Sequence, residues 1–132
     1  MAQKIPKPIH DDESKPFWDG LNNNELLIQH CKSCDHNIFY PRSLCPNCFS
    51  DQIHWCKSSG IGKIYSYTVV HQAFGLYKDE VPYIVGIVEL DEGVRMMTRI
   101  IGQRSQIRID NRVKVMFRRI EDDFTLPYFQ LV

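Results

Sequence analysis

Residues 30–50 read HCKSCDHNIFYPRSLCPNCFS, and this stretch decides the fold of the first part of the chain. It contains two C-x-x-C pairs with ten residues between them, formed by Cys31, Cys34, Cys45 and Cys48. A C-x-x-C turn directs two thiolates toward one point, so two such turns can close a tetrahedral site of four sulfurs. The spacing predicts one bound metal ion. Zinc is the expected ion because it is redox-inactive and suited to four thiolates, and iron is the competing choice.

Four cysteine ligands predict a structural metal site, because they leave no coordination position for water or substrate. Short apolar runs that favour β-structure lie around the cysteines, at Leu26–Ile28, Ile38–Tyr40 and Ile53–Trp55. Three short strands clipped by one metal form a zinc ribbon, which is expected over residues 31–57 and is too small to fold without its metal. Two unrelated redox or disulfide pairs are the alternative interpretation of the same cysteines.

A short helix is predicted between a polar N-terminal tail and a lead-in strand, all within residues 1–30. Ser14 is placed to cap this helix and Pro16 suits its first turn, whereas Gly20 and the asparagines after it are expected to end it. The tail, over residues 1–14, is polar and lacks periodicity, which is typical of a solvated terminus.

Bulky apolar side chains fall on one side of the predicted helix, at Phe17, Trp18 and Leu21. They have two interpretations. They either pack against the chain's own domain or form an exposed anchor for a partner protein, since aromatic residues dominate the hot spots of protein interfaces. The second interpretation predicts that their replacement weakens association with that partner.

After Ser58-Ser59-Gly60 the pattern favours β-strands throughout. Five runs rich in β-branched and aromatic residues are expected to form strands: Ile61–Gln72, Pro82–Leu90, Val94–Ile101, Arg112–Ile120 and Pro127–Val132. Gly86 interrupts the second run and predicts a bulge or a sharp bend. Five strands with a bent first hairpin fit a closed barrel of the oligonucleotide/oligosaccharide-binding (OB) type over residues 58–132, with a small sandwich as the alternative. The chain is therefore predicted to be mainly β.

The composition limits the classes of function that the chain can have. Sixteen basic and sixteen acidic residues give a formal net charge of zero, which argues against a general nucleic-acid binder. No run approaches the roughly 18 consecutive apolar residues of a membrane span. The opening segment, MAQKIPKPIHDDESK, lacks the apolar core of a secretory signal, and we therefore expect a cytoplasmic protein whose cysteines stay reduced.

Several motifs together resemble one family of small proteins. They are Phe17-Trp18-x-Gly20-Leu21, Cys31-x-x-Cys34, Phe39-x-Pro41-Arg42, Cys45-Pro46-x-Cys48 and Trp55-x-x-x-Ser59-Gly60-x-Gly62-x-Ile64-Tyr65. The resemblance covers the region from about residue 15 to about residue 120. Asn24 stands where many relatives have glycine, and asparagine tolerates the same left-handed turn. The family combines an N-terminal helix, a rubredoxin-like zinc ribbon and an OB-fold barrel, and the resemblance implies the same fold here.

Members of this family accompany acyl-CoA enzymes of the thiolase superfamily. The resemblance therefore implies a non-catalytic accessory subunit in a heteromeric complex with a thiolase-fold partner, with the acyl-CoA ester shared between the two chains. Arg42, Lys63 and Tyr65 are the candidate contacts to coenzyme A, because arginine forks suit phosphates and aromatic faces suit adenine. Each of them is otherwise an ordinary surface charge or core aromatic.

Two other classes of function stay open. Zinc ribbons and OB folds also occur in proteins that bind single-stranded nucleic acid. The barrel half carries many basic residues, namely Arg95, Arg99, Arg104, Arg108, Arg112, Lys114, Arg118 and Arg119. Acidic residues are interleaved with them, which weakens this alternative. A free-standing enzyme is the third hypothesis, with His71 as its candidate general base, but no nucleophile is paired with a base outside the metal site; Cys56 is expected to be a buried, unreactive thiol.

Overall fold

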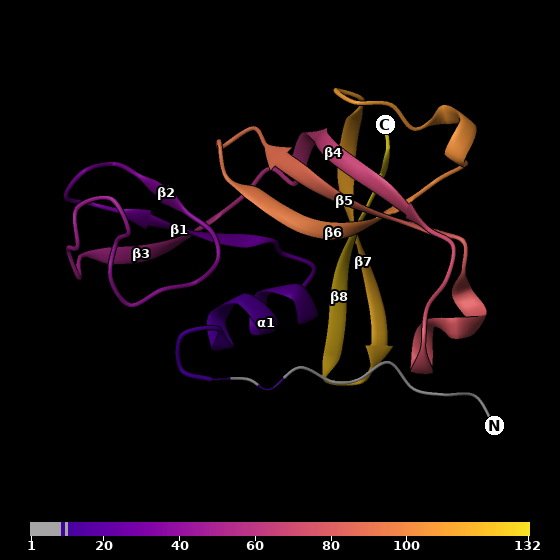
Figure 1. Cartoon of the computed structure of the whole chain (residues 1–132). Helices are drawn as coiled ribbons and strands as arrows, with labels where there is room; N and C mark the ends of the chain where they lie inside the picture. Colours follow the sequence, from indigo (N-terminus) through magenta and orange to yellow (C-terminus); the bar gives the residue numbers. More distant parts are fainter. Residues whose placement is uncertain (1–8, 10) are drawn as a thin grey trace.

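The computed structural model describes Ile9 and residues 11–132, and Figure 1 shows their arrangement. Most of the tail predicted over residues 1–14 lies outside the described residues. The elements follow in the order α1 (Lys15–Asn22), β1 (Leu27–Cys31), β2 (Asn37–Ile38), β3 (Ile53–Lys57), β4 (Ile61–Val70), η1 (Gly75–Glu80), β5 (Tyr83–Leu90), β6 (Arg95–Ile101), η2 (Arg104–Gln106), β7 (Arg112–Glu121) and β8 (Phe124–Leu131). Within this described part, no helix has the length and apolar composition that crossing a membrane requires. The prediction of a mainly β chain is confirmed.

Helix α1 begins where the sequence predicts and ends at Asn22, the first of the asparagines that were expected to end it. Ser14 occupies the N-cap position but makes no side-chain cap; its own N–H donates to Asp11 Oδ1 at 2.8 Å. Gly20 was expected to end the helix and instead lies inside it, where the side chain of Leu27 packs into the space that a Cβ would fill. The chain leaves the helix through Asn24, whose φ of 58° gives the predicted left-handed turn.

The ribbon is a three-stranded antiparallel sheet in the order β2-β1-β3. The predicted strands are present with shifted ends, since β1 continues to Cys31 and β3 continues to Lys57. Gln29 is buried at the centre of β1. Its amide bonds the main chain of Arg42 twice, donating to the carbonyl at 3.0 Å and accepting from the N–H at 2.7 Å. These bonds hold the loop that carries Arg42 against the sheet.

Strands β4 to β8 close a barrel in the order β4-β5-β6-β8-β7, and β7 pairs back onto β4. The pairing is antiparallel except between β6 and β8. This closed five-stranded topology confirms the OB-type barrel and excludes the sandwich. Gly86 pairs with Tyr67, next to the bulge in β4 between Ile64 and Ser66, and a side chain at Gly86 would meet the Ser66 carbonyl. The last strand begins at Phe124, earlier than predicted, and Pro127 lies inside it.

One continuous apolar core joins the helix, the first strand and the barrel. Its buried members are Phe17, Leu21, Leu26, Ile28, Ile64, Ile84, Val88, Leu90, Val94, Met96, Ile100, Ile107, Val113 and Phe129. A separate small cluster in the ribbon contains Cys31, Ile38 and Cys45. Because members of α1 and β1 share the barrel's core, burial of apolar surface stabilises these parts together.

Asn22, at the end of α1, fastens the helix to the turn between β7 and β8. Its Oδ1 accepts from Thr125 Oγ1 at 2.8 Å, and its Nδ2 donates to the carbonyl of Asp123 at 3.1 Å. Arg119 Nη2 donates to the main-chain carbonyl of Asn22 at 2.9 Å. Figure 1 shows α1 beside β8, so segments from opposite ends of the sequence form one packed layer.

Candidate metal centre and ligand clefts

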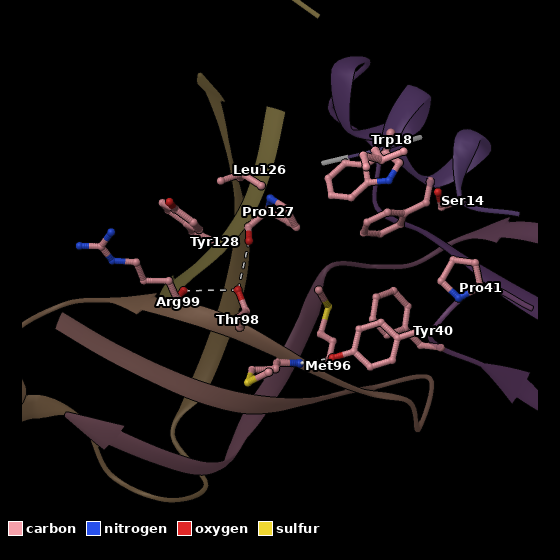
Figure 2. A pocket seen from close by; sticks show the side chains of 14 residues that line it. Ser14, Trp18, Tyr40, Pro41, Met96, Thr98, Arg99, Leu126, Pro127 and Tyr128 are labelled. Atoms are coloured by element: carbon pink, nitrogen blue, oxygen red, sulfur yellow. Dashed lines mark hydrogen bonds between the residues drawn. The ribbon is translucent and has the colours of Figure 1, made fainter. Parts of the chain in front are cut away.

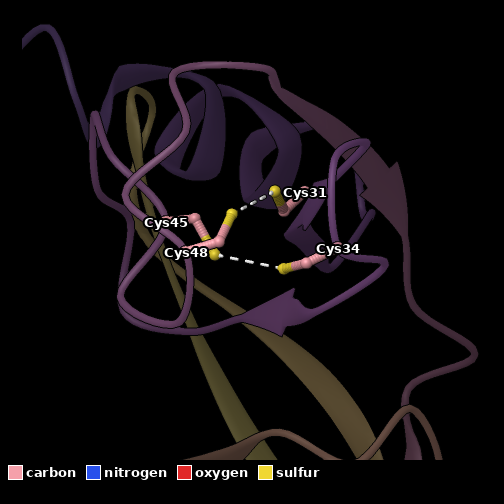
Figure 3. Close-up of side chains that lie close together, drawn as sticks. All are labelled: Cys31, Cys34, Cys45 and Cys48. Carbon is pink, nitrogen blue, oxygen red and sulfur yellow. Dashed lines mark hydrogen bonds between the residues drawn. The ribbon is translucent and has the colours of Figure 1, made fainter.

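The four cysteines of the two C-x-x-C pairs lie together in the ribbon (Figure 3). Their Sγ atoms are all within 4.8 Å of one another. The Sγ atoms are 3.6 Å apart in the Cys31–Cys48 pair and in the Cys34–Cys45 pair. A tetrahedron with metal–sulfur bonds of about 2.3 Å has edges of about 3.8 Å. The thiols therefore have the arrangement that a four-sulfur metal site requires.

The two C-x-x-C turns have the same main-chain hydrogen bonds. In each turn the residue after the second cysteine donates its N–H to the carbonyl of the first cysteine. Asp35 donates to Cys31 at 2.9 Å, and Phe49 donates to Cys45 at 2.8 Å. The φ angles of Asp35 and Phe49, 61° and 63°, lie in the left-handed region. One local turn, used twice, thus directs four thiols to one centre.

Asn47 supports the cluster from the second turn. Its Nδ2 donates to Cys34 Sγ at 3.5 Å, and its main-chain N–H donates to Cys45 Sγ at 3.4 Å. The hydrogen bond from Asn47 lowers the pKa of the Cys34 thiol to about 7, which favours the thiolate that binds metals. Cys31 and Cys45 are buried and Cys48 is exposed. This donor set fits one tetrahedral metal ion that would stabilise the ribbon.

Cys56 and His71 lie outside this cluster. Cys56 is on β3 and is half-buried, and burial raises the pKa of its thiol. A raised pKa keeps the sulfur in its less nucleophilic protonated form. His71 is exposed in the connection that follows β4.

The three side chains that were predicted to face a partner differ in burial. Phe17 and Leu21 lie in the chain's own core, with exposed fractions of 6% and 0%. Trp18 is half-buried and packs edge-on against Phe17 and Phe124, with ring centroids 5.2 and 6.4 Å apart. Self-packing accounts for Phe17 and Leu21, which corrects the expectation of an anchor made by all three. The interface prediction narrows to Trp18 and stays a prediction.

A cavity of about 420 Å³, here called the apolar groove, opens between α1, residues 39–41 and strands β6 and β8 (Figure 2). Its walls include Trp18, Phe39, Met96, Met97, Pro127 and Tyr128. Two polar side chains on its wall already have partners within the protein. Thr98 Oγ1 donates to the Pro127 carbonyl at 3.1 Å, and Arg99 pairs with Glu80 at 3.0 Å. The sequence carries no signal for this groove, because its walls come from segments that only the fold brings together.

The candidate coenzyme A contacts lie near a second hollow. Arg42 and Arg95 line a polar cavity of about 300 Å³ between the ribbon and the β5–β6 turn, here called the cationic cleft. The guanidinium of Arg95 lies 3.9 Å from the ring centroid of Tyr65, which places Tyr65 beside the cleft. Lys63 is not part of its wall, and its ammonium is 3.8 Å from each of two carboxylates. Arg95 therefore lies beside two of the predicted contacts, Arg42 and Tyr65. Nothing in the sequence distinguished Arg95 from the other basic residues of the barrel.

Several basic residues of the barrel are paired with acids. The pairs are Arg99–Glu80 and Arg112–Asp91, both at 3.0 Å, and Arg95–Glu89 at 3.6 Å. Such pairing reduces the positive field that attracts a nucleic-acid backbone. The side-chain arrangement therefore adds no support to the nucleic-acid alternative.

Comparison with known proteins matches both parts of the chain to named families. The family described as "ChsH2, rubredoxin-like zinc ribbon domain" matches residues 18–54, and "ChsH2, C-terminal OB-fold domain" matches residues 55–118. A "DUF35 domain-containing scaffold protein" of Methanocaldococcus jannaschii is 37% identical over 109 residues, which cover 80% of this chain and 77% of that protein.

Two further relatives are named as subunits of acyl-CoA enzymes. A "probable enoyl-CoA hydratase alpha subunit" of Thermomonospora curvata is 31% identical over 130 residues, which cover 95% of this chain and only 39% of that subunit. "Benzoylsuccinyl-CoA thiolase subunit BbsA" of Thauera aromatica is 27% identical over 93 residues, which cover 70% of this chain and 63% of that subunit. The chain therefore spans less than two thirds of either of these subunits.

A solved structure matches this chain over almost its whole length. A chain of "Ltp2-ChsH2(DUF35) aldolase" superposes with a TM-score of 0.86 at 29% identity, and the match covers 95% of this chain and 98% of that one. The match includes the helix, the ribbon and the barrel. This chain therefore belongs to the DUF35 family, in which a rubredoxin-like zinc ribbon precedes an OB fold.

Proposed function

We propose that this chain is a non-catalytic accessory subunit of a thiolase-superfamily complex that acts on an acyl-CoA ester. It docks on a thiolase-fold partner, helps to bind or cover the CoA ester, and stabilises the complex. The observation that carries this proposal is the likeness to the chain of Ltp2-ChsH2(DUF35) aldolase, with a TM-score of 0.86 over 95% of this chain. The relatives named as hydratase and thiolase subunits support the same role.

Zinc is the proposed metal of the ribbon. The four-cysteine donor set suits zinc, and the matching family is described as a zinc ribbon. With all four ligands supplied by cysteine, the ion has no open position for substrate, so its role is to keep the ribbon folded.

Coenzyme A is proposed to bind beside the junction of ribbon and barrel. Arg42 and Arg95 in the cationic cleft suit its phosphates, and the face of Tyr65 suits its adenine. Lys63 stands next to these groups and shares the carboxylate of Glu89 with Arg95. Its charge is partly neutralised there, so Lys63 contributes less than the two arginines.

The catalytic groups are assigned to the partner. Among the described residues, four of the five cysteines converge on the metal site, and burial raises the pKa of the fifth, Cys56. Covalent acyl-CoA chemistry needs a nucleophile activated by a neighbouring base. The described part of the chain does not place a thiolate beside such a base away from the metal site.

The test is co-expression of this chain with a thiolase-fold protein from the same organism, followed by size-exclusion chromatography. The two chains are expected to elute together, and thiolysis or condensation of acyl-CoA is expected only from the complex. Turnover by the isolated chain would overturn the accessory role. Salt-sensitive binding of a single-stranded oligonucleotide, with no association with a thiolase-fold protein, would establish the nucleic-acid alternative instead.

A further inference from the structure

The apolar groove and the cationic cleft are neighbouring parts of one seam between the N-terminal part and the barrel. Phe39 contributes to the walls of both. Strand β6 runs past both hollows: Arg95 lines the cationic cleft, and the next two alternate residues, Met97 and Arg99, line the apolar groove. Alternate residues of a strand share one face, so this row spans about 13 Å at about 3.3 Å per residue.

The groove has the properties of a site for an apolar group. Two methionines line it, of which Met96 is buried and Met97 is 63% exposed, and methionine side chains adapt to irregular apolar shapes. Its volume of about 420 Å³ falls among small-molecule pockets of about 300–1,000 Å³. Because Thr98 and Arg99 already have partners, a charged ligand group would gain little binding free energy from them in the groove.

The cleft offers the opposite chemistry. Arg42 forms no ion pair with any residue of the described part of the chain. Arg95 has one carboxylate partner, Glu89 at 3.6 Å, and half of its side chain is exposed. Guanidinium forks match phosphate oxygens and form charge-assisted hydrogen bonds with them. A ligand that fills both hollows must therefore carry phosphate at one end and an apolar group at the other.

We propose that the apolar groove holds the acyl group of an acyl-CoA ester whose phosphates lie in the cationic cleft. The accessory chain itself then selects esters with large apolar acyl groups, in addition to any selection by the catalytic partner. This inference rests on the proposed function for the identity of the ligand. It goes further by assigning acyl recognition to this chain and by fixing the direction of the ester along β6. A side chain of the partner protein is the competing occupant of the groove.

The test is isothermal titration calorimetry of the full-length, zinc-loaded chain with two probes, CoA and decanoyl-CoA. Each methylene that becomes fully buried raises affinity about fourfold. Even partial burial of the decanoyl chain in the groove is therefore expected to make decanoyl-CoA bind at least tenfold more tightly than CoA. Equal affinities for the two probes, or no binding of either, would overturn the inference.

Two pairs of variants locate the two ends of the ligand. Met97→Asp is expected to remove the tenfold preference for decanoyl-CoA and to leave CoA binding unchanged. Ile109→Asp, at a residue 52% exposed outside the groove, is the matched control and is expected to keep the preference. Arg95→Ala is expected to lower the affinity for both probes by the same factor. Arg104→Ala, at a residue outside the cleft, is expected to leave both affinities unchanged. A preference that survives Met97→Asp would contradict the assignment of the groove.

Association with the thiolase-fold partner is measured separately, without ligand, so that the two proposals can fail independently. Co-elution with the partner combined with equal affinities for CoA and decanoyl-CoA would overturn the inference and leave the proposed function intact. A preference for decanoyl-CoA in a chain that does not associate would support the inference and overturn the proposed complex. If Met97→Asp weakens association and changes neither ligand affinity, the groove is a protein-docking surface and the inference is wrong.

Discussion

Asn37, on β2, donates its Nδ2–H to the main-chain carbonyl of Glu92 at 2.9 Å, across the junction between ribbon and barrel. The carboxylate of Glu92 accepts two further hydrogen bonds from the linker between the two sheets. Ser58 Oγ donates at 2.8 Å and the Ser59 N–H donates at 2.9 Å. One residue of the β5–β6 turn therefore connects the ribbon, the linker and the barrel, next to the cationic cleft.

Replacing Glu92 with alanine is expected to lower the free energy of unfolding by about 1–3 kcal/mol. The variant loses a charged acceptor and leaves the buried Ser58 hydroxyl without its acceptor. Urea denaturation followed by tryptophan fluorescence measures the change. Asp79→Ala removes an exposed carboxylate on η1 as a control, and is expected to change stability by no more than about 0.5 kcal/mol. Equal midpoints for the two variants would contradict the role of Glu92.

Metal analysis of the purified protein is expected to give close to one zinc per chain, because the four thiols form one site. Cys45→Ser is expected to lose the metal and unfold the ribbon, since a structural zinc site supplies folding energy directly. Cys56→Ser, at the cysteine outside the cluster, is the control and is expected to retain the metal. A metal-free protein with unchanged thermal unfolding would contradict the site, and a red protein with visible absorption would identify iron.

Alanine substitutions at Phe17 and Trp18 are expected to have different effects. Phe17→Ala removes a buried core side chain and is expected to cost about 3–5 kcal/mol of stability. Trp18→Ala is expected to weaken association with a thiolase-fold partner by about 2 kcal/mol or more, as at an interface hot spot. Thermal unfolding and surface plasmon resonance separate the two effects. If Trp18→Ala binds the partner as well as the wild type does, the helix serves only self-packing.

Asp91, in the turn that follows β5, and Arg112, at the start of β7, form an ion pair at the surface. The Arg112 guanidinium donates to both carboxylate oxygens of Asp91 at 3.0 Å, and this hydrogen bonding holds the pKa of Asp91 below its usual 3.8. A lowered pKa in the folded state gives stabilisation that is present above the unfolded-state pKa and is lost as the pH falls through the folded value. Asp91→Asn is therefore expected to unfold at a slightly lower temperature than the wild type at pH 7. The two melting temperatures should converge as the pH falls below 3.8. A difference in melting temperature that stays constant with pH would show that the ion pair is not the cause of that difference.

The parts of the fold that depend on local chemistry could be predicted from the sequence. Cys31 and Cys45 each open a turn of five residues that is closed by its own main-chain hydrogen bond, so their spacing alone indicates the cluster. Gly86 marks a point of close approach beside the bulge in β4, where a Cβ would meet Ile100 and the Ser66 carbonyl. For the cysteines the physical cause of the structure is contained within the motif itself, whereas for Gly86 the glycine reports the approach of two neighbouring strands.

Features that depend on contacts between distant segments could not be predicted. Gly20 resembles a helix terminator in sequence, but Leu27 packs against it and the helix continues. Arg95 occupies an outward position on a strand and looks like any solvated charge until the fold places it in the same cleft as Arg42. Phe17 and Trp18 are adjacent in sequence, and only the position of the barrel decides that the first is buried and the second half-buried.

The shared core and the contacts of Asn22 have a consequence for how this chain would position other molecules in the proposed complex. Helix, ribbon and barrel cannot swing independently, because any rotation between them would break apolar packing and the hydrogen bonds to Thr125 and Asp123. A flexible tether only raises the local concentration of the proteins that it joins. A rigid connector also fixes the distance and angle between them, so in the proposed complex a partner bound at Trp18 and a ligand bound in the cationic cleft would keep one mutual orientation.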